Sequence, residues 1–333
     1  MSARQTIASR FRRTFRPAIL PLVIALYASP VESADLSLGP LSSAGREYAA
    51  YASDAAPPEK EHSSMSPTPE QMQRRTLGII LGGAAALGVY GKTHWWQNGF
   101  DSGFHTASEG WFGQNTYAGG ADKFGHLYMT YAVTRLFSRA YEWAGNTPDA
   151  SLRMAAVMTL SAFTAVEILD GMTQKWRFSK EDAIMNAVGV GAALLLEKNP
   201  AIDRVLDLRL QYWPSPENRH NFDPFGDYSG QTYLLVAKAS GIPALREHHW
   251  LRYLEFAVGY GSRGYGDPQS AVNSERSRNV YVGISLNLSE VLRDSVFRHS
   301  FEPSRPQRFT ETFLEYVQVP GTAALHAHRL PPD

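Results

Sequence analysis

The stretch from residue 122 to residue 197 constrains the fold most, because it holds three apolar segments that each carry a polar pair. The pairs are Asp122 with His126, Glu167 with Asp170, and Asp182 with Asn186. A spacing of three or four residues places both members of a pair on one face of a helix. The sequence therefore predicts three helices whose polar faces converge at one end of a bundle.

Helix capping could explain two of these pairs without any functional site. Asp122 follows two glycines and an alanine, where it could accept backbone N–H groups at the start of a helix. Ser179 and Asp182 have nearly the spacing and composition of a capping box. Glu167 and Asp170 differ, because an apolar run with no other charge leads into them. Such carboxylates need a partner, a metal or a proton, so a structural network and a functional site both stay open.

Carboxylates together with one imidazole suit a divalent metal or an acid–base pair. The candidate metal ligands are Asp122, His126, Glu167, Asp170, Asp182 and Asn186. The candidate catalytic residues are Glu167, Asp170 and Gln174. Beyond a divalent metal no cofactor is expected. The chain has no phosphate-binding glycine loop and a net charge of zero, which favours neither a nucleotide nor a nucleic acid as partner.

The N-terminus has the layout of an export signal. Arginines precede an apolar run from Pro17, and small residues at Val31 and Ser33 fit a cleavage point after Ser33. The run is shorter than the roughly 20 residues of a membrane-spanning helix. We expect residues 1–33 to be a signal peptide and the protein to be periplasmic, associated with the inner or outer membrane. The chain has no cysteine, so neither a disulfide nor a lipid-bearing cysteine after the signal is expected.

Composition divides the remaining chain into four segments. Residues 34–75 are predicted to be a disordered linker, 76–245 a helical bundle core, 246–320 a β-hairpin and helix attachment, and 321–333 a disordered tail. Residues 252–262 and 279–288 alternate polar and apolar side chains, which predicts the two strands of an antiparallel hairpin. Other segments complete the prediction: a Pro-rich connector from residue 209, a short helix at 232–239, and helices at 289–297 and 309–316. The predicted fold class is mainly α, a helical bundle with a small C-terminal antiparallel β-hairpin.

Two segments before the polar pairs could contact a membrane. Residues 77–90 form a Gly- and Ala-rich apolar run that could be either a buried core helix or a membrane-inserted one. Residues 91–121 are rich in glycine and aromatics, so they could face lipid headgroups or cap the bundle. An apolar outer surface with Trp95 and Trp96 at its edge would favour membrane contact.

The order of these motifs resembles a known family. D-K-x-x-H begins at Asp122, Glu167 precedes Gln174, and F-S-x-x-D-x-x-x-N-x-x-G runs from Phe178 to Gly189. This order resembles the YfiM-like family of predicted periplasmic or outer-membrane bacterial proteins of unknown function. A weaker similarity connects the chain to VanZ-like membrane proteins, from which the spacing of Glu167 and Gln174 departs. The resemblance covers residues 80–290 and implies an envelope location and a helical core, without an established activity.

Two functions are compatible with these observations. The first is a non-enzymatic, exported cell-envelope protein that associates with a membrane or an envelope protein. The second is a metal-dependent hydrolase of an envelope lipid or glycan, in which the carboxylates and His126 hold the metal and Glu167 activates water. The sequence leaves open whether the chain is an enzyme.

Overall fold

The computed structural model describes residues 67–173, 175–218, 224–265, 275–298 and 303–333. All of them belong to one compact unit. The expected signal peptide, most of the expected linker and Gln174 lie outside the described residues.

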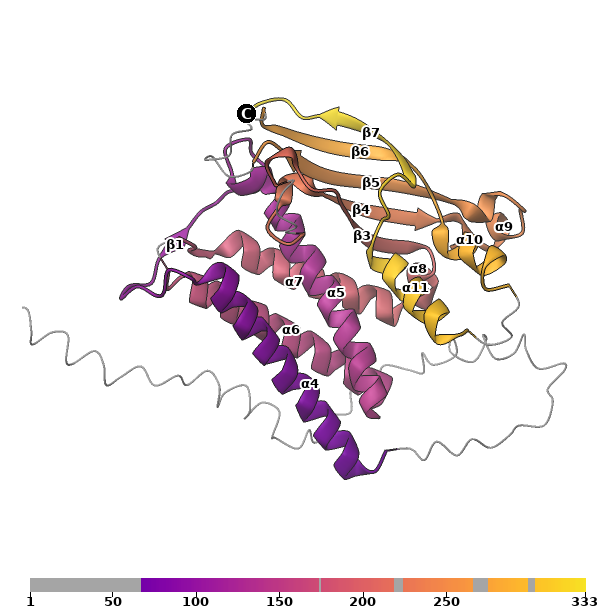
Figure 1. Cartoon of the computed structure of the whole chain (residues 1–333), viewed down its shortest axis with the longest axis horizontal. Coiled ribbons are helices and arrows are strands. Elements are labelled where there is room, and N and C mark those ends of the chain that lie inside the picture. Colours follow the sequence, from indigo (N-terminus) through magenta and orange to yellow (C-terminus); the bar gives the residue numbers. More distant parts are fainter. Residues whose placement is uncertain (1–66, 174, 219–223, 266–274, 299–302) are drawn as a thin grey trace, which may run out of the picture. The chain divides into compact units, whose positions relative to one another are not determined.

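Four long helices form the helical part of the structure (Figure 1). They are α4 (Pro69–Tyr90), α5 (Ala121–Ala144), α6 (Pro148–Asp170) and α7 (Lys180–Lys198). Helix α5 is central, because it packs against the other three helices and against the sheet. The three helices predicted from the polar pairs are confirmed as α5, α6 and α7.

The helix ends follow from local sequence. The Thr68 hydroxyl and the Gln71 side chain form a capping box at the start of α4, so this helix begins inside the segment predicted to be a disordered linker. The Ser179 hydroxyl caps α7 by accepting the Asp182 N–H at 3.3 Å, as expected. The N-cap of α5 is Gly120, with a φ of 80°, and not Asp122. Asp122 therefore has its carboxylate available for another partner.

Five antiparallel strands form a sheet in chain order. They are β3 (Leu206–Tyr212), β4 (Gln231–Lys238), β5 (Leu254–Arg263), β6 (Ser277–Leu286) and β7 (Ala323–Arg329). A short parallel pair, β1 (Thr106–Ala107) and β2 (Phe178–Ser179), joins the aromatic connector to the start of α7. The predicted hairpin is confirmed as β5 and β6. The fold is mixed α/β rather than mainly α, because the hairpin is part of a larger sheet.

Three predictions in the C-terminal region were wrong. The segment predicted as a helix at 232–239 is strand β4, whose first four residues are all buried and so lack the alternation that marks a strand. The first four residues of the connector predicted from residue 209 belong to β3, and the tail predicted to be disordered contains β7, which pairs with β6. These strands are held by pairing to distant segments, which local composition does not reveal.

Short helices complete the unit. Helices α8 (Pro200–Asp203) and α9 (Pro243–Arg246) each make about one turn, and α10 (Leu288–Ser295) and α11 (Arg305–Tyr316) confirm the two helices expected near the C-terminus. The core between α5 and the sheet is rich in tyrosine, with Tyr128 and Tyr131 from α5 meeting Tyr233 of β4 and Tyr260 of β5. The Tyr128 hydroxyl donates to the Tyr316 carbonyl at 2.7 Å, which ties α5 to the end of α11.

The contact between α5 and α7 depends on a glycine. A Cβ at Gly189 would overlap the Leu127 carbonyl oxygen and the Thr130 hydroxyl of α5, whereas a Cβ at Gly191 would meet no atom within 4 Å. We expect Gly189→Ala to destabilise the fold by about 1–3 kcal/mol through overpacking. Gly191→Ala should be neutral or stabilising by up to about 1 kcal/mol, since alanine favours the helix. Urea unfolding of both variants measures the difference, and equal stabilities would contradict the close α5–α7 contact.

Candidate functional site

The centre of the predicted polar cluster is a lysine, Lys123, which is fully buried. Its ammonium lies 2.5 Å from Glu109 Oε2, 2.7 Å from Asp122 Oδ2 and 2.8 Å from Asp182 Oδ1. These partners come from the aromatic connector, from α5 and from α7, so one cation holds three segments together. The carboxylates raise the pKa of Lys123 against the effect of burial, which keeps the ammonium charged.

A second group surrounds His126, one turn along α5. Its Nδ1 lies 3.1 Å from Asn186 Oδ1 and 3.5 Å from Glu167 Oε1, and its Nε2 lies 3.8 Å from Asp182 Oδ1. The Asn186 amide also donates to Glu167 Oε1 at 3.4 Å. Asp182 therefore joins the two groups, since it faces both Lys123 and His126.

Asp170 lies at the end of α6 and has a different partner. The indole N–H of Trp96 donates to Asp170 Oδ1 at 2.6 Å, which fastens the aromatic connector to α6. Nearby, Glu181 is buried and accepts a hydrogen bond from the Ser108 hydroxyl at 3.2 Å. The connector is thus bound to the helix ends by polar contacts at several points.

Burial and mutual repulsion raise the pKa of several carboxyls. Burial raises the pKa of Glu167 to about 9, and the charges of Asp182 and Asp170 add to the effect. Burial raises the pKa of Asp122 to about 7 against the attraction of Lys123, and that of Asp170 to about 6 against the Trp96 hydrogen bond. Burial would also raise the pKa of Asp182, but His126 and Lys123 lower it below its usual value. At neutral pH the cluster thus combines an ionised Asp182 with a protonated Glu167.

Two groups of side chains have the composition of a metal site among the described residues. In the first group, Glu109, Asp122 and Asp182, the Lys123 ammonium already occupies the position between the carboxylates. The second group, His126, Glu167 and Asp182, contains no lysine, and Asn186 adds an amide oxygen to it. A cation could be held at the second group.

The structure brings most predicted site residues together. Asp122, His126, Glu167, Asp182 and Asn186 lie at one end of the helices, and Asp170 is next to them through Trp96. The sequence prediction did not include Lys123 or Glu109 among the candidate site residues. The D-K dipeptide was visible, but an isolated lysine is normally exposed, and only the fold shows that this one is buried.

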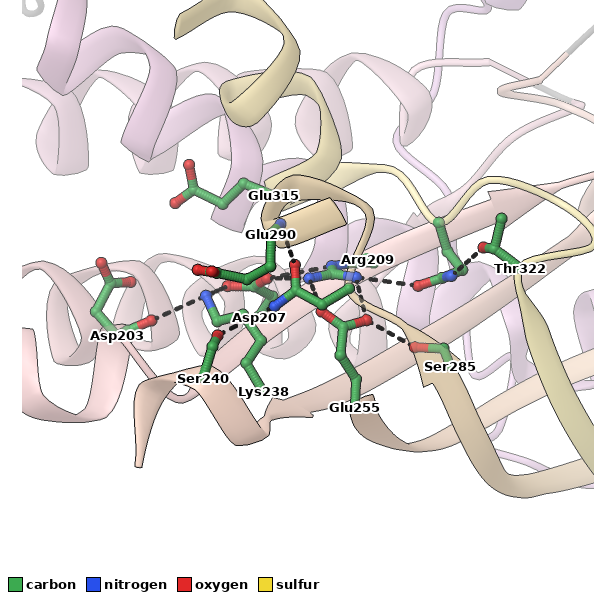
Figure 2. Close-up of polar contacts among 12 residues, drawn as sticks. Asp203, Asp207, Arg209, Lys238, Ser240, Glu255, Ser285, Glu290, Glu315 and Thr322 are labelled. Atoms are coloured by element: carbon green, nitrogen blue, oxygen red, sulfur yellow. Dashed lines mark hydrogen bonds and ion pairs between the residues drawn. The ribbon is translucent and has the colours of Figure 1, made fainter. Parts of the chain in front are cut away.

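Arg135 and Arg209 are also buried, and each is paired with acids from distant segments. Arg135 of α5 pairs with Glu197 of α7, Asp203 of α8 and Glu315 of α11, at 2.6–2.8 Å. Arg209 of β3 pairs with Asp207 and with Glu255 of β5, as Figure 2 shows, and it also donates to Gln318. Lys238 and Ser285 complete this second network through Asp207 and Glu255. Each network is composed of paired groups that join distant segments, which indicates a structural role.

Comparison with known proteins gives one match. Residues 108–198 match the model of a family described as predicted periplasmic lipoprotein, DUF2279. No curated protein and no solved structure matches the chain. The match places the protein in the periplasm, exported and associated with a membrane, as the sequence predicts. The word lipoprotein in this description implies a lipid-bearing cysteine, and the 333 residues contain no cysteine. Lipid attachment is therefore stated of the family and not of this chain.

The raised pKa of Glu167 makes stability depend on pH. The folded state holds this proton up to a pH of about 9, whereas the unfolded chain releases it near the ordinary glutamate pKa of 4.5. The free energy of unfolding should therefore fall as pH rises from 5 to 9, by up to about 1.4 kcal/mol per pH unit for this group. Glu167→Gln should remove that share of the slope, because an amide does not titrate. Urea unfolding in the presence of a chelator measures both slopes. An unchanged slope in Glu167→Gln would contradict the protonated state.

Proposed function

We propose that the protein is a non-enzymatic cell-envelope protein that attaches to a membrane through the exposed sides of α4, α6 and α7. The observation that carries this proposal concerns α6. Within the described ranges, α6 is the one helix that is long and apolar enough to cross a membrane. Even so, only 28% of its most apolar 18-residue stretch is buried in the structure. A helix this apolar in a water-soluble core would have most of its surface covered.

Helices α4 and α7 also expose apolar side chains. Helix α4 has no buried residue and exposes Leu77, Leu81 and Val89. Helix α7 exposes Ile184, Val188 and Leu195, which recur at helical spacing along one face. Helix α6 adds Val157 and Leu160. Exposed apolar patches that continue over several elements mark contact with a membrane or a partner.

The distribution of charge supports lipid as the contact. Lys123 and Arg135 are fully buried and paired, while the outer faces of these helices are apolar. Helices that contact hydrocarbon are expected to have their charged residues in the interior of the protein and apolar residues on the outer surface. The sheet packs along α5, and strands β5 and β7 carry Arg263 and Arg329. We therefore propose that the helices lie along the membrane surface rather than across it, which keeps these arginines in water.

Flotation with phospholipid vesicles tests this attachment. The double variant Val157→Asp, Leu160→Asp places two charges on the exposed side of α6, and we expect it to lose flotation because charges are costly in hydrocarbon. The matched control is Val296→Asp, Phe309→Asp, at exposed positions at the end of α10 and on α11. This control should float like the parent. Loss of flotation in the control variant alone, or a parent that binds no vesicle, would contradict the proposal.

The hydrolase prediction remains a second candidate, because one set of donor atoms has the spacing of metal ligands. His126 Nδ1 lies 3.1 Å from Asn186 Oδ1 and 3.5 Å from Glu167 Oε1. Ligands bound at 2.0–2.1 Å around a tetrahedral zinc ion are about 3.3 Å apart. The three side chains could hold a divalent ion with little movement. A bound ion would supply an activated water for hydrolysis of an envelope lipid or glycan.

Metal content separates this candidate from a structural network. If the site binds metal, protein dialysed against zinc should retain about one equivalent, and His126→Ala, Glu167→Gln should retain none because two donors are lost. His105→Ala removes an imidazole of the connector and should keep the ion. Circular dichroism confirms that each variant is folded. A parent without metal would exclude this candidate.

A further inference from the structure

A cavity of about 420 Å³ lies where the aromatic connector meets the end of α6. Trp95 and Phe100 form apolar parts of its lining, and Asn98 and Lys175 add polar groups. This volume and this mixture of walls are typical of small-ligand sites. The site described above does not use the cavity, although Thr173 in its wall donates to the Asp170 carbonyl at 2.9 Å.

The cavity presents a cation that has no acidic partner. No described carboxylate pairs with the Lys175 ammonium, which lies 4.5 Å from the centre of the Trp176 ring. Asp101 is the acidic residue of the lining, and its oxygens are engaged by His105 at 3.2 Å and by the Ser102 N–H at 2.6 Å. Lys175 is therefore the group of the lining that can pair with an anion.

The surroundings match the headgroup region of a membrane. Exposed basic residues flank the cavity in the chain at Arg177 and Lys180, and exposed aromatic rings lie at Phe100 and Phe104. Basic and aromatic side chains together are typical of the membrane interface, where lysine is attracted to anionic lipids. The cavity also adjoins α6, the helix whose apolar face carries the proposed attachment.

We propose that this cavity binds the phosphate headgroup of an anionic phospholipid, with Lys175 as the ionic contact and Asn98 as a hydrogen-bond donor. The inference rests on the proposed membrane attachment and adds a lipid class to it. Trp95 and Phe100 lie beside the glycerol and upper acyl region, so the headgroup is held at the edge of the apolar surface. Lys175 acts by charge, since a lysine ammonium is a point donor without fixed geometry.

Vesicle binding with and without phosphatidylglycerol tests the assignment. We expect the parent to prefer the anionic vesicles, and Lys175→Ala to weaken that binding about fivefold, as one basic residue at an anionic surface contributes. Lys92→Ala is the matched control. Lys92 is exposed on the aromatic connector, which forms part of the cavity wall, but Lys92 itself does not line the cavity. It should change the binding by less than about twofold. Binding to neutral phosphatidylcholine vesicles should be the same for all three proteins.

The outcomes separate the two proposals. A parent that binds no vesicle contradicts the membrane attachment itself. A parent that binds both kinds of vesicle equally, or equal losses in Lys175→Ala and Lys92→Ala, overturns the cavity assignment and leaves the attachment intact. Calorimetry with glycerol phosphate, without vesicles, distinguishes the source of the phosphate. Tight binding of this soluble compound, together with an unchanged vesicle preference in Lys175→Ala, would overturn the assignment to lipid.

Discussion

The ammonium of Lys123 is the interaction on which the helical part of the structure depends. It lies without solvent contact among carboxylates from the connector, α5 and α7. Removal of one member of a buried ion pair typically costs about 3–5 kcal/mol, because the remaining charge loses its compensation. The position of Asp182 follows from this contact, and Asp182 in turn faces His126. The geometry of the candidate site is therefore fixed by a residue that is outside the candidate metal ligands.

The same principle operates in two other places. Arg135 joins α5 to α7, α8 and α11, and Arg209 joins β3 to β5 and to the segment after α11. These cations lie where helices and strands that are distant in sequence meet, and each cation contacts acids at particular positions of the neighbouring elements. A shift in register would separate each buried cation from its acids, and an uncompensated buried charge is costly. The fold can then leave apolar side chains on its outer surface, because the interior charges define how the elements pack.

The sequence predicted the parts of this structure that depend on local periodicity. Spacings of three and four residues identified three helices and the face on which each polar pair lies, and alternation identified β5 and β6. Strand β3 was missed because its inward Asp207 and Arg209 resemble a polar connector, although Leu206, Leu208 and Leu210 pack against the core from its other face. Strand β7 was missed because its partner is some forty residues away in the chain. Buried lysine and arginine are exceptional, so no composition rule points to Lys123 or Arg135.

The pairing of charges distinguishes membrane attachment from metal-dependent hydrolysis, because the two functions require different external partners. Lys123 supplies one positive charge to the three acids that contact it, and Glu167, whose pKa is raised to about 9 by burial and nearby carboxylates, holds a proton at neutral pH. Most groups of the polar cluster thus have a partner within the chain, as a structural network requires. The exposed faces of α4, α6 and α7 have no partner within the described part of the chain, because no described segment covers Leu77, Val157 or Ile184. An uncovered apolar surface needs a partner, and a paired interior does not. This asymmetry is why attachment to a membrane, rather than metal chemistry, is the function that the structure supports first.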